Sequence, residues 1–190
     1  MNTERMRKRL LAGWVAGLLV SLVGCQSHPL PSMPMVEQVD IPRFMGRWYV
    51  IAHIPTFLER EVHNAVETYA LNPDGSIATT FTYLDGGFDG KPGRMTPTGY
   101  VRDTRSNALW GMEFIWPIEA DYRIVYLAPD YSLTVIGREK RDYVWVMART
   151  PRIPEPIYQD LASRIASWGY DVAALRRVPQ RWPTSGEALP

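Results

Sequence analysis

The chain has 190 residues, and 46% of them are hydrophobic, which is enough to fill the core of one domain. Its 21 lysines and arginines nearly balance its 20 acidic residues, so the formal net charge is +1. This balance gives no electrostatic reason to expect a nucleic acid as a partner. The single cysteine, Cys25, excludes a disulfide within the chain.

The N-terminus has the features of an export signal. A basic stretch at 5–9 precedes an apolar stretch at 10–22, which is short for a membrane-spanning helix because such a helix needs roughly 20 apolar residues. We therefore expect residues 1–24 to be a signal peptide. The end of this segment, Leu22-Val23-Gly24-Cys25, resembles the lipobox of bacterial lipoproteins, which implies cleavage before Cys25 and acylation of its sulfur.

The residue after the cysteine bears on the location. In enteric bacteria an aspartate there favours retention in the inner membrane, so Gln26 implies anchoring in outer-membrane lipid, with the protein facing the periplasm. The alternative is an ordinary exported protein with an unmodified cysteine. Prolines in the following segment predict an extended tether over 25–35, and we expect a folded domain over 36–182 and a tail over 183–190.

In the folded part, segments rich in β-branched and aromatic residues alternate with turn signals such as Asn72-Pro73-Asp74-Gly75. This spacing predicts an all-β fold, an eight-stranded antiparallel up-and-down barrel whose closure removes exposed strand edges. The expected strands are 47–54, 65–71, 76–83, 97–102, 108–115, 122–127, 132–138 and 143–149.

One helix is expected after the strands. Pro156 lies near its start, Ile157, Leu161 and Ile165 recur at four-residue spacing, and Gly169 ends it. This apolar stripe predicts packing against the outside of the barrel wall.

Three separated motifs resemble those of the lipocalins, and within them the bacterial outer-membrane lipocalins related to apolipoprotein D and to plant temperature-induced lipocalins. They are Gly46-Arg47-Trp48-Tyr49 in the first strand, the turn Leu127-Ala128-Pro129-Asp130-Tyr131, and Arg149 in the last strand. The resemblance implies that Arg149 stacks on Trp48 and closes the barrel base, and that Gly46, Asp130 and Tyr131 are structural.

The resemblance also implies a ligand site in the lumen. Strand alternation from Trp48 together with the family register predicts an apolar and aromatic lining that suits a lysophospholipid or a fatty acid. The residues expected to face this lumen are Val50, Ile77, Phe81, Trp110, Met112, Phe114, Ile124, Tyr126, Trp145 and Met147. The alternative is a filled core without a cavity.

One departure from the family concerns a carboxylate. Close relatives commonly carry glutamate where this chain has Val50 and a small residue where it has Glu67. Alternation puts Glu67 with Tyr69 on the face assigned to the lumen, and we expect Glu67 to orient the polar end of a ligand. A register error that leaves Glu67 in solvent is the alternative.

Catalysis has little support in the sequence. Alternation puts His53 outside the barrel, and no metalloprotease, nucleophile-elbow or phosphate-loop motif is present, so we expect no catalytic residue, metal or cofactor. Phe57 and Leu58 are expected to form a rim or lid. Two rival functions remain, a lipid- or isoprenoid-modifying enzyme and a partner-binding envelope lipoprotein with a filled core, and whether the chain forms a homodimer is left open.

Overall fold

The computed structural model describes residues 31–55 and 61–182. Its strands and helices follow one another in the order α2 (Ile41–Phe44), β1 (Gly46–His53), β2 (Val62–Leu71), β3 (Ile77–Asp85), β4 (Lys91–Met95), β5 (Thr98–Val101), β6 (Leu109–Ile115), β7 (Ile118–Leu127), β8 (Leu133–Gly137), β9 (Trp145–Ala148), α3 (Glu155–Ser167), the 3-10 helix η1 (Val172–Ala174) and β10 (Arg176–Arg177).

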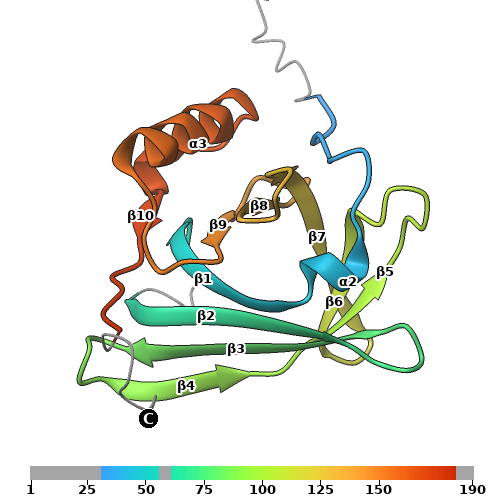
Figure 1. Cartoon of the computed structure of the whole chain (residues 1–190), viewed down its shortest axis with the longest axis horizontal. Helices are drawn as coiled ribbons and strands as arrows, with labels where there is room; N and C mark the ends of the chain where they lie inside the picture. Colours follow the sequence, from blue (N-terminus) through green and yellow to red (C-terminus); the bar gives the residue numbers. More distant parts are fainter. Residues whose placement is uncertain (1–30, 56–60, 183–190) are drawn as a thin grey trace, which may run out of the picture. The chain divides into compact units, whose positions relative to one another are not determined.

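The antiparallel sheet closes on itself. Neighbouring strands follow chain order from β1 to β9, and β9 returns to pair with β1, with Tyr49 opposite Ala148 (Figure 1). Because β4 and β5 both pair with β3, they occupy one position in the wall. The prediction of a closed barrel with eight strand positions is confirmed.

The sequence did not predict β4. Its Lys91-Pro92-Gly93 start has the composition of a turn, yet Lys91 pairs with Asp85 and Met95 pairs with Phe81 across β3. Gly93 is required here, since a Cβ on it would lie 2.3 Å from the ring of Tyr83. The ring of Tyr83 packs directly on the backbone of β4 at Gly93, a close approach for which strands commonly use glycine.

Four register shifts interrupt the pairing of the described strands, and two of them change the faces of predicted site residues. The β1–β9 register shifts between Val50 and Ala52, and the β7–β8 register shifts between Ile124 and Tyr126. Each bulge adds one residue to a strand, so the residues after it exchange faces.

The hydrophobic core has two parts. One fills the lower barrel and contains Trp48, Tyr69 and Trp110. The other lies between the outer wall and α3, where the helix buries Tyr158, Leu161 and Ile165. The predicted helix and the packing of Leu161 and Ile165 outside the wall are confirmed, but Ile157 of the expected stripe is 40% exposed and Tyr158 is buried in its place. The chain leaves α3 through Gly169, whose φ is +90°.

The segment before α2 lies against the barrel. Met33 is buried in the outer core, and its backbone N–H donates to the carboxylate of Glu139 at 3.2 Å. The backbone N–H of Val36 donates to the carbonyl of Ile124 at 3.0 Å. The compact unit begins at Ser32, four residues before the expected start of the domain.

The expected signal peptide, Cys25 and the tail over 183–190 lie outside the described residues. Within the part that the structure describes, no helix has the length and apolar character that crossing a membrane requires.

Candidate functional site

The base of the barrel is closed by aromatic rings. Helix α2 starts at the cap Asp40, whose carboxylate accepts from the backbone N–H of Arg43 at 3.2 Å. The helix places Phe44 in the core, with its ring centre 5.1 Å from that of Trp48 and 5.4 Å from that of Trp110. The indole N–H of Trp48 donates to the carbonyl of Phe44 at 2.9 Å, so this buried ring is fixed in position.

Arg149 covers this aromatic layer from outside. Its guanidinium carbon lies 3.8 Å from the ring centre of Trp48. Its N–H groups donate to the carbonyls of Arg47 at 2.8 Å and Arg43 at 2.9 Å. Gly46 takes a φ of +93°, a conformation that favours glycine, and its backbone lies beside Arg149, since a Cβ on it would be 3.5 Å from the guanidinium. The geometry shows Arg149 and Trp48 stacked at the closed base.

The turn between β7 and β8 ties the base to α2. Asp130 accepts from the backbone N–H of Ser132 at 3.0 Å, which fixes the turn. Tyr131 takes a positive φ of 62°, and its hydroxyl accepts from the backbone N–H of Asp40 at 2.9 Å. Both residues hold backbone in place, which agrees with the structural role that the resemblance implied.

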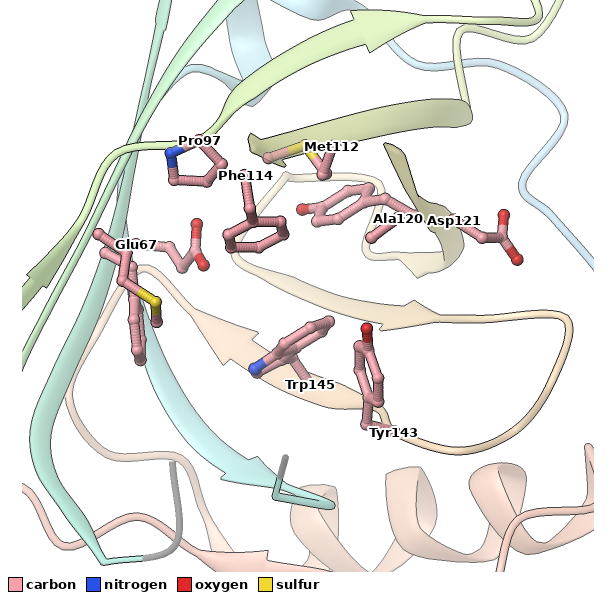
Figure 2. Close-up of a pocket in the computed structure, with 11 residues that line it drawn as sticks. Glu67, Pro97, Met112, Phe114, Ala120, Asp121, Tyr143 and Trp145 are labelled. Carbon is pink, nitrogen blue, oxygen red and sulfur yellow. The ribbon is translucent and has the colours of Figure 1, made fainter. Parts of the chain in front are cut away.

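Above the base the barrel contains a small cup. Figure 2 shows Glu67, Phe114 and Trp145 converging on it from three strands. The empty volume of the cup is about 410 Å³ when the open mouth is included. Only about 30 Å³ of this volume can hold the centre of a water molecule, so the cup is narrow. The lining side chains come from Glu67, Phe81, Met95, Pro97, Met112, Phe114, Ala120, Asp121, Tyr122, Tyr143 and Trp145.

Glu67 points into the lumen. On β2 it lies opposite Trp48 of β1 and opposite Phe81 of β3, and both of these rings are in the lumen core. Since residues directly opposite each other in a sheet share a face, Glu67 lies on the lumen side. The structure thus places the carboxylate where alternation predicted it.

Two tyrosines connect Glu67 to the aromatic base. The hydroxyls of Tyr69 and Tyr122 lie 2.7 Å apart. Burial raises the pKa of Tyr69 well above its ordinary value of 10.0, and the charge of Glu67 and a hydrogen bond with it raise it further. Burial and the Glu67 charge also raise the pKa of Tyr122. Both phenols are therefore neutral at physiological pH.

The structure brings eleven of the twelve residues predicted for the ligand site to the lumen side. Five of them line the cup, namely Glu67, Phe81, Met112, Phe114 and Trp145. The other six are packed into the filled core below or beside it, namely Val50, Tyr69, Ile77, Trp110, Ile124 and Met147.

The prediction that Tyr126 faces the lumen is wrong. It packs in the outer core, with the guanidinium carbon of Arg164 from α3 5.4 Å from its ring centre. The bulge after Ile124 causes the difference, because it turns both Val125 and Tyr126 to the outer face. Tyr126 is therefore not a lumen residue.

The prediction for His53 was wrong in the opposite direction. The prediction placed His53 outside, but the bulge after Val50 pairs His53 with Trp145, which lines the cup. His53 is buried and shares the lumen face with that tryptophan. The sequence carries no local signal for either bulge.

Several cup residues were missed by the sequence reasoning. Met95 and Pro97 belong to the β4–β5 strand position, whose first half was not predicted. Tyr122 has the same parity as Ile124 in the expected strand 122–127, so alternation could have found it. Tyr143 starts the expected strand 143–149 and has the same parity as Trp145, so alternation could have found it as well, although β9 itself begins only at Trp145.

The rim of the cup carries an apolar hairpin between β6 and β7. Phe114 is 52% exposed, Ile115 74%, Trp116 79% and Ile118 71%. Since Phe114 also lines the cup, this hairpin is continuous with the mouth of the cavity. The expected lid residues Phe57 and Leu58 lie outside the described residues.

Among the described residues that line the cup, Glu67 is the one that directs a carboxylate into it. Asp121 contributes to the lining, but Figure 2 shows its carboxylate turned away from the cavity, where it pairs with Arg123 at 3.0 Å. Among the described residues, no group of three or more metal-ligating side chains is arranged to hold a metal ion. The site is an apolar cup with one acidic group at its floor.

The comparisons with known proteins agree with this architecture. A family model described as a lipocalin-like domain matches residues 39–180. Temperature-induced lipocalin-1 of Arabidopsis thaliana is 33% identical over 157 residues, which cover 78% of this chain and 83% of that protein. Outer membrane lipoprotein Blc of Escherichia coli is 27% identical, over 90% of this chain and 96% of that protein.

The solved structure of insecticyanin from the tobacco hornworm Manduca sexta shares the fold. Its TM-score is 0.60 at 12% sequence identity, and the match covers 78% of this chain and 84% of that one. The closed barrel, the stacked Trp48 and Arg149 and the family-model match together show that the chain belongs to the lipocalin family.

Proposed function

We propose that this chain is a lipid-anchored lipocalin that binds a hydrophobic ligand, a lysophospholipid or a fatty acid, and stores or transports it in the cell envelope. The observation that carries the proposal is the apolar cup in the upper half of a closed barrel. Lipocalins are in general binding proteins, and the cup offers Phe81, Met112 and Trp145 as contacts for an acyl chain.

Binding would work by reversible burial of the chain. Each buried methylene contributes about 0.8 kcal/mol, so affinity should rise about fourfold per methylene until the cup is full. The free space is small, so side chains must move to admit a ligand. Met95 and Met112 suit this because the thioether chain is unbranched and adapts its shape.

The location rests on the N-terminal signals and on the relatives. The expected signal peptide over 1–24 would direct export and be cleaved before Cys25, the acyl chains on Cys25 would anchor the domain in outer-membrane lipid, and the segment over 25–35 would connect the anchor to the domain. The relatives named Outer membrane lipoprotein Blc support the same location, with the domain facing the periplasm.

The test is a chain-length series. Lysophospholipids and fatty acids of increasing length are titrated into the full chain, and binding is followed by quenching of tryptophan fluorescence, with Trp145 as the reporter in the cup. Affinity that rises with length and then levels supports the proposal. Failure of every chain length to bind contradicts it.

The filled lower barrel and the exposed hairpin favour a second candidate, a partner-binding envelope lipoprotein. Trp116 and Ile118 would then contact a protein, or a second copy of the chain in a homodimer. Loss of partner binding in Trp116→Ser, without any ligand uptake by the native chain, would support this candidate. A lipid-modifying enzyme has less support, because the carboxylates of Glu67 and Asp121 do not converge in the cup.

A further inference from the structure

The segment before α2 bears on which end of the barrel meets the membrane. We propose that this segment, attached at the mouth, turns the open end of the barrel toward the bilayer that holds acylated Cys25, and that the apolar hairpin 114–118 lies in the surface of that bilayer. The partner of the hairpin is thus a lipid surface. The inference rests on the proposed function, since the anchoring of Cys25 is part of it.

The backbone before α2 passes along the outer wall and reaches the base only at its end. Asp40 lies at the base, where its backbone N–H donates to the hydroxyl of Tyr131 at 2.9 Å. Val36 lies farther up the wall, and its backbone N–H donates to the carbonyl of Ile124 on β7 at 3.0 Å. Followed backward from α2, the chain therefore climbs from the base toward the mouth.

Met33 is attached at the mouth itself. Its side chain is 3% exposed, and its methyl carbon would lie 3.4 Å from a Cβ on Gly137, the last residue of β8. Its backbone N–H donates to the carboxylate of Glu139, which also pairs with Arg123 at 2.8 Å. The backbone N–H of Glu139 donates to Asp121 of the cup lining at 2.7 Å. Met33 is thus held by the loop that follows β8 at the open end.

The length of the expected tether limits where the anchor can lie. Residues 25–31 connect Cys25 to the attached segment, and an extended chain spans at most about 3.5 Å per residue, so Cys25 and Ser32 can be no more than about 25 Å apart. The residues from 33 to 40 use a similar length to pass from the mouth to the base. An anchor beneath the base would need residues 25–31 to turn back and run fully extended along the whole wall. A bilayer on the mouth side needs no such reversal.

The apolar hairpin projects from the same end of the barrel. Ile118 begins β7 at the hairpin, three residues before Asp121, which accepts the hydrogen bond from the Glu139 backbone. Ile115, Trp116 and Ile118 are 71–79% exposed. The attachment point of the tether and the hairpin therefore lie close together at the mouth, and one surface can meet both.

The hairpin suits a lipid surface better than a protein. A stable protein interface uses roughly 20–30 residues a side, whereas the hairpin offers four exposed apolar side chains, those of 114–116 and 118. A tryptophan is amphipathic and is typical of the boundary between a membrane and water. Glu119, next to the turn, accepts from the guanidinium of Arg102 at 3.0 Å, so its charge is paired. A small apolar contact that supplements acyl chains is a common arrangement for membrane attachment.

This orientation would place the cup at the source of its ligand. Phe114 belongs to the exposed hairpin and also lines the cup, so an apolar surface is continuous from the tip of the hairpin into the cavity. A single-chain lipid could then pass from the bilayer along Phe114 into the cup. Its acyl chain would not have to cross water, where exposed apolar surface is unfavourable.

The experiment places an environment-sensitive fluorophore at each end of the barrel. Ile115→Cys carries it on the hairpin. The control Leu71→Cys carries it at the base, because Leu71 is 48% exposed and lies two residues beyond Tyr69, which is opposite Gly46. The chain has one native cysteine, so once Cys25 is acylated the introduced thiol is the only one that reacts. Each acylated chain is inserted into phosphatidylcholine vesicles with and without a nitroxide-labelled phospholipid.

We expect the emission of the fluorophore at Ile115 to shift to shorter wavelength in the vesicles and to be quenched by the nitroxide lipid. The fluorophore at Leu71 should keep the emission that it has in water. Addition of Trp116→Ser to the Ile115→Cys chain should reduce the shift and the quenching, because the hairpin loses its largest apolar side chain. Circular dichroism of each variant verifies that it is folded.

Three results would overturn the inference while ligand uptake by the native chain stays intact. The first is a hairpin fluorophore that remains in water, and the second is stronger quenching at Leu71 than at Ile115. The third is a shift at Ile115 that the nitroxide lipid does not affect and that grows with protein concentration, which would indicate a second copy of the chain as the partner. Mass spectrometry that finds Cys25 unmodified would instead refute the lipid anchor of the proposed function, and this inference with it.

Discussion

Replacement of Arg149 by alanine tests the closure of the barrel base. The variant loses a cation–π contact with Trp48, worth about 0.5–2 kcal/mol. It also removes donors from the carbonyls of Arg43, Phe44 and Arg47, each worth about 1 kcal/mol net because these groups are close to solvent. The expected loss in the free energy of unfolding is therefore about 3–5 kcal/mol.

This loss is a large part of the stability of an ordinary domain, which is about 5–15 kcal/mol. At about 2–4 °C per kcal/mol for a chain of this length, the melting temperature should fall by roughly 10 °C. Arg149→Lys keeps the charge but not the planar fork, so it should lose about half as much. Arg152→Ala, which removes an exposed arginine three residues away, is the matched control and should change stability little.

The assay is urea unfolding followed by tryptophan fluorescence. A loss below about 1 kcal/mol in Arg149→Ala would refute the reasoning, as would an Arg149→Lys variant as stable as the native chain. Folded Arg149→Ala should bind ligand with native affinity, because the layer that contains Trp48 and Phe44 separates Arg149 from the cup.

Three further predictions concern the cup, the phenols and the rim. Ala120→Phe should fill the cup and abolish binding of acyl chains, which a fluorescence titration measures, while the melting temperature stays within a few degrees. The raised pKa values of Tyr69 and Tyr122 mean that the folded state holds these protons more tightly than the unfolded state. The stability that they contribute is therefore fully present below about pH 10 and is lost as the pH rises above it. Denaturant unfolding at pH 8 and pH 11 should show a smaller loss of unfolding free energy in Tyr69→Phe than in the native chain. Replacement of Trp116 and Ile118 by serine should leave stability unchanged, since both side chains are exposed, but should slow ligand uptake in stopped-flow measurements.

Most of the fold follows from alternation and turn chemistry. In β2 the inward side chains of Glu67 and Tyr69 alternate with the exposed Thr68, so the two-residue repeat of a strand is enough to place the carboxylate in the lumen. The motif residues Trp48 and Arg149 meet at the base as the family resemblance implied.

The failures arise where the backbone departs from a two-residue repeat. A bulge inserts one residue without a compositional mark, so Tyr126 was assigned to the lumen and His53 to the exterior. Strand β4 was missed because Pro92 and Gly93 suit a turn, and only the tertiary contact with Tyr83 explains why glycine is needed there. The small size of the cup is likewise a packing result, set by how far Phe44 and Trp110 fill the base.

Native mass spectrometry of the full chain, purified under mild conditions so that bound molecules survive, tests the central claim most directly. We predict a folded protein that carries one co-purifying single-chain lipid, or that takes up one added lysophospholipid or fatty acid, and that loses it in Ala120→Phe. A native chain that remains empty and rejects every added lipid would contradict the account and would leave the partner-binding function in its place.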